Sequence, residues 1–365
     1  MDFTLTLPAW LRLDLPRRQP SLLGIDIGST AIRLIELARD GKPGAHGYRV
    51  ESCALESLPA SQHREVKDAD HVSIGEAIRK AVARSGSRTK VAAVAIPASA
   101  TITKVIPLGA GLTDSELEAR IEIDADQYIP YPQDEVNLDF TVLGPSVTPG
   151  EVDVLLAATR REIVDYYLAA LEYAGLKAAI VDVEPYALEN ASILCLGAAQ
   201  IEDCTTAITD IGATATRILI LRGERMIYSR EQGFAATQLI EEVRQRYGLE
   251  VDVAWRRIIG GDLPEDFGAE VLVPFQEAMA QQIGRALQFF TSSTLSQPPD
   301  QILLAGGVAA LAGFEEVIAQ RLRTRTYTAN PFRAMSLGPR VDAQLITRHA
   351  PGFAVAIGLA LRRFD

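Results

Sequence analysis

Two segments of the sequence combine an aspartate, a glycine and small polar residues in the pattern of a phosphate-binding turn. They run Asp26-Ile27-Gly28-Ser29-Thr30 and Asp210-Ile211-Gly212-Ala213-Thr214. In the first, a strand is expected to deliver the aspartate to a tight turn, where Gly28 permits positive φ and a close approach of the backbone to a phosphate. Backbone N–H groups and the hydroxyls of Ser29 and Thr30 can then donate to phosphate oxygens. The second segment repeats this arrangement, so the sequence predicts two phosphate-binding hairpins.

A lone turn of this kind is more often an ordinary hairpin connection. Two such turns at corresponding places in two similar halves of the chain favour a cleft in which both turns bind one triphosphate from opposite sides. A strand rather than a helix follows each turn, which separates the pattern from the glycine-rich turns of dinucleotide-binding folds and P-loops. Asp26 and Asp210 are the candidate ligands of a Mg²⁺ ion, with Asp26 acting through water because Mg²⁺ dehydrates reluctantly.

Two further segments are typical of a nucleotide cleft. Gly306 and Gly307 end an expected strand, and the lack of side chains there would let the backbone lie against adenine and ribose. Glu184 lies between an expected strand and a helix that begins at Pro185, where its carboxylate could orient an attacking water. Each segment has a structural alternative, which is a strand-to-helix turn for the glycines and a helix-capping acid for Glu184.

The composition is that of an acidic globular protein without metal-binding cysteine or histidine patterns. The 365 residues carry a formal net charge of −11, which disfavours generic nucleic-acid binding. The 3 cysteines are scattered and the 4 histidines form no zinc motif, so we expect a reducing compartment. No apolar run is long enough to span a bilayer and no signal peptide is recognisable, so the expected location is the cytoplasm.

Hydrophobic periodicity predicts an α/β protein made of two related halves. Strands are expected around the first turn at 22–27, 31–37 and 48–55, and around the second at 205–210, 217–221 and 226–230. Further strands are expected at 91–96, 102–106, 152–158, 179–183 and 301–305, with helices between them. One of these helices is expected to begin at a capping box formed by Thr113 and Glu116. Residues 1–20 form an extension whose alternating leucines and paired arginines suit a membrane face or a neighbouring strand, against the alternative of a disordered tail.

The order of these segments resembles the superfamily of actin, sugar kinases and DnaK-type ATPases. Within it, the sequence is similar to the PilM family of actin-like type IV pilus assembly proteins, over residues 21–365. The stretches that carry the resemblance are Gly24-Ile-Asp-Ile-Gly-Ser-Thr30, Gln127-Tyr-Ile-Pro-Tyr-Pro132, Glu135-Val-Asn-Leu-Asp-Phe140, Val181-Asp-Val-Glu184, Asn330-Pro-Phe332 and the ending from Gly358 to Asp365. The proline-rich stretch and the ending are more specific than the nucleotide-binding segments, which the whole superfamily shares.

The resemblance implies an actin-like two-lobe ATPase fold with a 1C subdomain like that of the division protein FtsA. The first lobe would comprise residues 21–88 and 159–200, the inserted subdomain 89–158, and the second lobe 201–365, with the last helix returning toward the first lobe. The implied cofactors are ATP and Mg²⁺, with slow or absent hydrolysis. The implied partner is the cytoplasmic N-terminal peptide of the inner-membrane protein PilN, docked between the subdomain and the first lobe. Pilus assembly ATPases and a second copy of the chain are further candidate partners.

A few positions depart from the family pattern. Arg33 stands where the family usually has lysine, so the charge at this candidate phosphate-binding position is kept. Ala235 and Ala236 replace a glycine pair and Ile240 replaces a threonine, while Trp255 and Ile258 stand where a glutamate and a lysine usually face the nucleoside. The alanine Cβ atoms could crowd the cleft, whereas Trp255 could stack on adenine.

Three other functions fit parts of the pattern. A small-molecule kinase of the same superfamily needs an aspartate base in a substrate pocket, and no motif singles one out. A filament-forming division protein like FtsA commonly ends in a membrane-binding helix, whereas this chain is expected to end with its last core helix. A scaffold whose cleft holds nucleotide weakly or not at all would account for the departures around Ala235 and Trp255.

Overall fold

The computed structural model describes residues 21–40, 47–58, 70–197, 200 and 202–364, so the predicted extension at 1–20 lies outside the described residues. The first of its three sheets has six strands in the order β14-β3-β2-β1-β4-β8. These strands are β1 (Leu23–Ile27), β2 (Ala31–Arg39), β3 (Tyr48–Ser57), β4 (Val91–Ile96), β8 (Lys177–Val183) and β14 (Ser336–Leu337).

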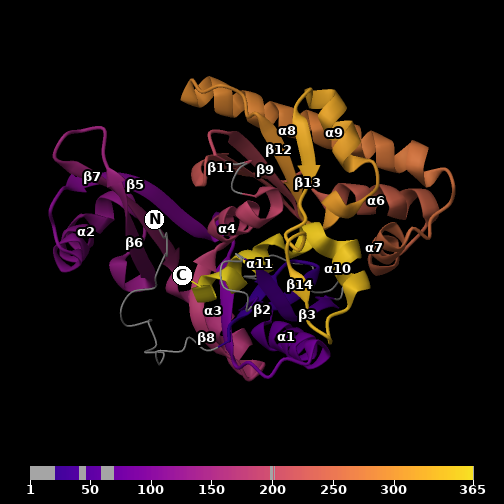
Figure 1. Ribbon diagram of the computed structural model, residues 1–365, viewed down its shortest axis with the longest axis horizontal. Coiled ribbons are helices and arrows are strands. Elements are labelled where there is room, and N and C mark those ends of the chain that lie inside the picture. The colour runs from indigo at the N-terminus through magenta and orange to yellow at the C-terminus, as the bar shows by residue number, and fades with distance from the viewer. Residues whose placement is uncertain (1–20, 41–46, 59–69, 198–199, 201, 365) are drawn as a thin grey trace.

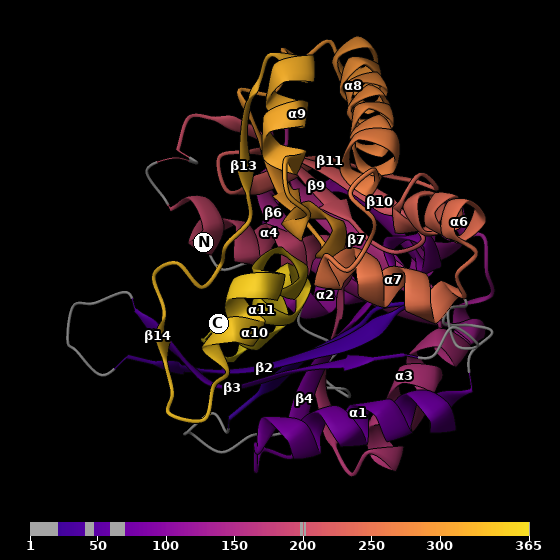
Figure 2. The same cartoon turned by 90° about the vertical axis from the view of Figure 1, so that its right-hand side faces the viewer.

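Helices cover both faces of this first sheet. Leu23, Ile25 and Ile27 of β1 belong to a core shared with α1 (His71–Ser85) and α3 (Arg161–Tyr173). The opposite face packs against α4 (Glu184–Leu196) and α11 (Ala354–Leu361). Figure 2 shows α1 and α3 below the sheet and α11 above it. The sheet with these helices is called the first lobe below.

The second sheet repeats the strand arrangement of the first. Its order is β11-β10-β9-β12-β13, from β9 (Thr205–Ile211), β10 (Thr216–Arg222), β11 (Arg225–Gln232), β12 (Gln301–Ala305) and β13 (Arg325–Thr328). In both sheets three antiparallel strands are followed by two parallel ones. Helices α6 (Ala236–Tyr247), α7 (Val251–Gly260), α8 (Val273–Thr294) and α9 (Phe314–Leu322) complete the second lobe.

The third sheet is a small unit to one side of the two lobes (Figure 1). Its order is β5-β7-β6, from β5 (Thr101–Gly109), β6 (Val136–Pro145) and β7 (Glu151–Arg160). Helix α2 (Asp114–Tyr128) covers one face and starts at the predicted capping box of Thr113 and Glu116. We call β5, β6 and β7 the small sheet.

The boundary of the small unit differs from the expected start at residue 89. Strand β4 pairs with β1 and β8 inside the first sheet, so the small sheet begins only at Thr101. The chain also returns to the first lobe near its end, because β14 pairs with β3 and α11 packs on β1. Helix α10 (Ala343–His349) lies between β14 and α11 along the chain. Among the described residues, no helix is both long and apolar enough to cross a membrane.

Candidate functional site

A cavity that is open to solvent is lined by both lobes. Every site residue proposed from the sequence lines it: Asp26, Gly28, Ser29, Thr30, Arg33, Glu184, Asp210, Gly212, Ala213, Thr214, Gly306 and Gly307. The two predicted hairpins therefore face one cavity. Two parts of its lining were not predicted: Arg217, and the segment of Pro351 and Gly352 that precedes α11.

The two hairpins are built alike. Asp26 lies opposite Arg33 in the β1–β2 ladder, and Asp210 lies opposite Arg217 in the β9–β10 ladder. Each turn is closed by one backbone hydrogen bond, in which Gly28 donates to Ala31 (3.1 Å) and Gly212 donates to Ala215 (3.0 Å).

Glycine is needed in these turns for space rather than for positive φ. Only some glycines of the chain have positive φ, and Gly28, which was expected to be one of them, is not. A Cβ on Gly28 would lie 3.1 Å from the Ala31 carbonyl oxygen, and one on Gly212 would lie 2.8 Å from that of Ala215. A side chain at either position would push the turn open, because the backbone oxygen cannot move independently of it.

The Gly306–Gly307 segment seals the cavity at the end of β12. Gly306 has a φ of 88°, and a Cβ there would lie 2.3 Å from the Ile211 carbonyl oxygen of the second hairpin. A Cβ on Gly307 would lie 3.4 Å from Nη2 of Arg33 and 4.0 Å from the ring of Trp255. The absent side chains thus bring backbone, guanidinium and indole together at one wall of the cavity.

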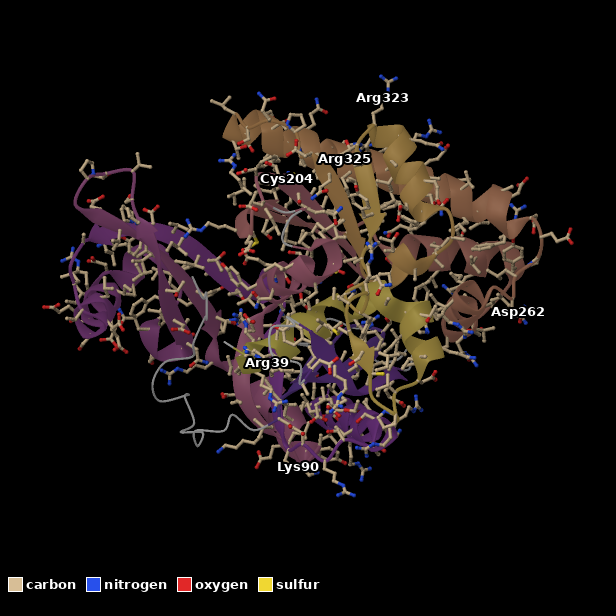
Figure 3. The ribbon with its side chains drawn as sticks, in the orientation of Figure 1. Arg39, Lys90, Cys204, Asp262, Arg323 and Arg325 are labelled. Atoms are coloured by element: carbon tan, nitrogen blue, oxygen red, sulfur yellow. The ribbon has the colours of Figure 1, made fainter. Side chains whose placement is uncertain are left out.

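Charged side chains crowd the floor of the cavity. Nη1 of Arg33 donates to Oδ2 of Asp26 at 3.1 Å. Nη1 of Arg217 donates to Oδ2 of Asp210 at 2.8 Å, and its Nε donates to Glu231 at 3.2 Å. The Nη2 group of Arg217 also forms an ion pair with Glu184. The side chains of Arg217 and Asp210 are largely buried, whereas Lys90 and Arg323, labelled at opposite ends of the molecule in Figure 3, are exposed to solvent.

Burial makes two acids of this cluster, Glu184 and Asp26, harder to ionise. It raises the pKa of Glu184 to about 8, against the opposing attraction of Arg217. It also raises the pKa of Asp26, and the charge of Asp210 adds to that rise. Burial alone would lower the pKa of Arg217, but Glu184 and Asp210 hold it above its usual value. The guanidinium is therefore a permanent charge of the cleft.

A magnesium ion does not fit the two aspartates as they lie. Each already accepts a hydrogen bond from a guanidinium, and Mg²⁺ requires near-octahedral oxygen ligands at about 2.0–2.1 Å. Among the described residues, no group of three or more acidic, histidine or cysteine side chains is arranged to hold a metal ion. As the side chains lie, direct Mg²⁺ ligation by the bonded oxygen of Asp26 or Asp210 would thus require the aspartate to give up its arginine.

The departures from the family pattern fall in different places. Trp255 and Ala236 line the cavity, so both can affect a bound ligand. Ile258 instead belongs to the buried core of the second lobe, as does Ile240. The expectation that Ile258 takes the place of a residue facing the nucleoside is therefore wrong, because its side chain is turned away into the core.

Two further hollows flank the small sheet. The one we call the apolar groove is lined by Val105, Leu143, Leu155, Tyr186 and Met226, with Thr141, Glu189, Asn190, Arg225 and Arg362 around them. It lies between the small sheet, α4 and β11. The one we call the polar groove is larger, joins the hairpins and includes Ile102, Tyr131, Arg160 and Tyr167. Strand β4 lies between β1 and β8 and offers no free edge to a peptide.

The chain matches the family described as type IV pilus assembly protein PilM over residues 24–364. It is 26% identical to a chain of a solved structure described as the PilM-PilN type IV pilus biogenesis complex. That match covers 94% of this chain and 98% of the other, with a TM-score of 0.77. The ethanolamine utilization protein EutJ from Carboxydothermus hydrogenoformans is 18% identical, with 98% and 92% covered and a TM-score of 0.53.

A more distant likeness is to MreB5 of Spiroplasma citri bound to ADP, at 12% identity, 93% and 94% coverage and a TM-score of 0.45. The duplicated sheet topology and the likeness to the PilM chain agree on the fold. It is the actin-like two-lobe α/β fold that the sequence predicts.

Proposed function

Because the chain belongs to the PilM family of type IV pilus assembly proteins, we propose that it binds ATP in the cleft and a PilN peptide beside the small sheet. The peptide would come from the cytoplasmic N-terminus of PilN and would hold the protein at the inner membrane. The observation that carries this proposal is the apolar groove between the small sheet, α4 of the first lobe and β11 of the second lobe, in a chain 26% identical to one described in complex with PilN.

The cleft has the donors that a polyphosphate needs. Ser29, Thr30 and Thr214 bring hydroxyls to its two hairpins. The Nε of Arg33 is buried without a hydrogen-bond partner, which is costly unless a ligand accepts from it. Trp255 lies beside Gly307, where its ring could stack on a base. We assign the phosphates to the hairpins and Arg33, and the adenine to the Trp255 wall.

ATP in this cleft is expected to be bound rather than turned over quickly. Glu184 is the acid placed to orient a water, but Arg217 already forms an ion pair with it. A carboxylate that is held by a guanidinium is less available to accept a proton from water as a general base. We therefore propose slow or absent hydrolysis, with nucleotide acting as a ligand.

The apolar groove suits an extended peptide with apolar side chains. The small sheet presents the face opposite α2 to the groove, where Val105 is 53% exposed. Both β5 and β6 are edge strands, which can pair with an added strand. The groove is held together by Glu189, which accepts from the backbone N–H of Met226 at 2.6 Å and so links α4 to β11.

The test is a titration of a labelled peptide of the PilN N-terminus into the full chain and three variants. Val105→Asp places a charge in the apolar groove and should weaken binding at least about tenfold, since burying an unpaired charge is costly. Val142→Asp is the matched control, because Val142 is also an exposed valine on an edge strand of the small sheet but lines neither groove. Its affinity should equal that of the wild type.

The third variant locates the peptide if the assignment is wrong. Ile102→Asp lies on the same strand as Val105 but faces the polar groove. Loss of binding in Ile102→Asp with retention in Val105→Asp would move the partner to the polar groove. Absence of binding to the wild type would remove the partner proposal altogether. Circular dichroism of each variant guards against reading a folding defect as a binding defect.

A further inference from the structure

Arg217 bridges the two lobes across the floor of the cleft. It lies on β10 of the second lobe and is bonded to Asp210 and Glu231 of the same sheet. Its ion pair with Glu184 reaches the first residue of α4 in the first lobe. The side chains of Arg217 and Glu184 are 16% and 8% exposed, so this contact between the lobes is shielded from water.

The guanidinium stands where the negative charge of the cleft converges. Four carboxylates act on it electrostatically, namely those of Glu184, Asp210, Glu231 and Asp26. One cation neutralising carboxylates from both lobes is the arrangement that a divalent metal ion would otherwise provide. A planar guanidinium can perform this role because it offers five N–H donors and stays protonated at every ordinary pH.

The same carboxylates cannot serve the guanidinium and a metal ion at once. The 2.8 Å hydrogen bond from Arg217 occupies Oδ2 of Asp210. A cation held about 2.0–2.1 Å from that oxygen would have to displace the guanidinium, leaving two positive centres in one small volume. The arginine and the metal are therefore alternatives.

We propose that Arg217 is the resident cation of this cleft and replaces the divalent metal ion, so that nucleotide binds without Mg²⁺. The second half of this statement rests on the proposed binding of ATP. The first half concerns only the residues of the chain. A covalently attached cation is always present, so chelators cannot remove it and the concentration of free metal does not control the site.

The experiment has a metal arm and a nucleotide arm. In the first, Mn²⁺ is titrated into the full chain without nucleotide and its free fraction is followed by electron paramagnetic resonance. The wild type should show no site that depends on Asp210. Arg217→Gln should gain one Mn²⁺ site, at least about tenfold tighter than any in the wild type, because removing one partner leaves the carboxylates uncompensated. Adding Asp210→Asn to Arg217→Gln should abolish it.

In the nucleotide arm, ATP is titrated by calorimetry in the presence of Mg²⁺ or of EDTA. The affinity of the wild type should agree within about twofold between the two conditions, a free-energy difference below about 0.5 kcal/mol. Arg217→Gln should bind at least about tenfold more weakly in EDTA than in Mg²⁺. Arg222→Gln is the matched control, since Arg222 is an exposed arginine on the same strand, outside the cavity lining.

Three results would overturn the proposal. They are a Mn²⁺ site in the wild type that Asp210→Asn removes, a wild type that binds ATP only with Mg²⁺, and an Arg217→Gln variant that folds but takes up no Mn²⁺. If that variant does not fold, the two wild-type measurements still decide. If the wild type binds no ATP under either condition, the proposed nucleotide function fails, while the metal arm still tests the role of Arg217.

Discussion

Arg362, near the end of the chain, forms a buried ion pair with Asp182 at the end of β8. Its Nε donates to Oδ2 of Asp182 at 2.7 Å, and the two side chains are 2% and 1% exposed. Asp182 also accepts from the backbone N–H of Val183, which orders the turn into α4 and hence the position of Glu184. The pair therefore ties the C-terminal helix to the strand that carries a cleft residue.

Removing one member of this pair should be costly. Arg362→Met is expected to lower the free energy of unfolding by about 3–5 kcal/mol, because it leaves the Asp182 carboxylate buried without its cation. The double variant Arg362→Met/Asp182→Asn should recover part of that loss, since no buried charge remains. Urea unfolding followed by circular dichroism measures both. Equal stability of the single and double variants would show that lost packing, not the buried charge, dominates.

At this scale the sequence located the cleft but not the partners of its charges. The types and order of Asp26, Gly28, Asp210 and Gly306 were enough to predict that these residues line one cavity. Arg217 was missed, although it follows Asp210 at the spacing at which Arg33 follows Asp26. Comparing the two hairpins residue by residue would have found it. No local signal marks Pro351 and Gly352, because the return of the chain brings them to the cleft.

Among the elements, α11 is the one most tightly built into the first lobe. A Cβ atom on Gly358 would lie 1.8 Å from the carbonyl oxygen of Ala187 in α4. A Cβ atom on Gly24 in β1 would lie 2.0 Å from the carbonyl oxygen of Ala356 in α11. Glycines at these two positions let helix, strand and neighbouring helix approach backbone to backbone. The close packing positions α4, and Glu184 at its first turn, against the sheet.

Gly358→Ala tests this packing. Alanine favours a helix over glycine by about 1 kcal/mol, so propensity alone predicts a gain in stability. The clash with backbone predicts a loss of about 3 kcal/mol instead, at the upper end of overpacking effects. Gly260→Ala in α7 is the control, because nothing lies within 4 Å of its Cβ position, and it should be neutral or slightly stabilising. Equal melting temperatures for the two variants would contradict the packing account.

Elements with strong local patterns were mostly predicted from the sequence, whereas an element that depends on contacts with distant parts of the chain was not. The strands around both hairpins and the capping box before α2 were predicted from local patterns. Strand β14 has only two residues, both exposed, and exists because it pairs with β3 from the other end of the chain. Strand β6 was missed although it carries a local signal, because apolar and polar residues alternate regularly from Val136 to Val142.

At the scale of the whole molecule, two similar lobes meet over a cleft whose floor is a network of charges. The network joins the lobes through Arg217 and Glu184, and the small sheet adds a groove beside them. Ligands of the cleft and of the groove would therefore contact elements common to both, above all α4. If binding in the cleft and binding in the groove are coupled, each ligand must change the affinity for the other ligand by the same factor.

The central claim is that the cleft between the lobes binds ATP, and calorimetric titration of ATP into the full chain tests it most directly. The wild type should show one saturable site, and Arg33→Gln should bind at least about tenfold more weakly because it loses a charge-assisted bond to phosphate. Arg39→Gln, at the far end of the same strand against the ring of Phe364, should match the wild type. No saturable heat with the wild type, or equal affinity in Arg33→Gln, would contradict the claim.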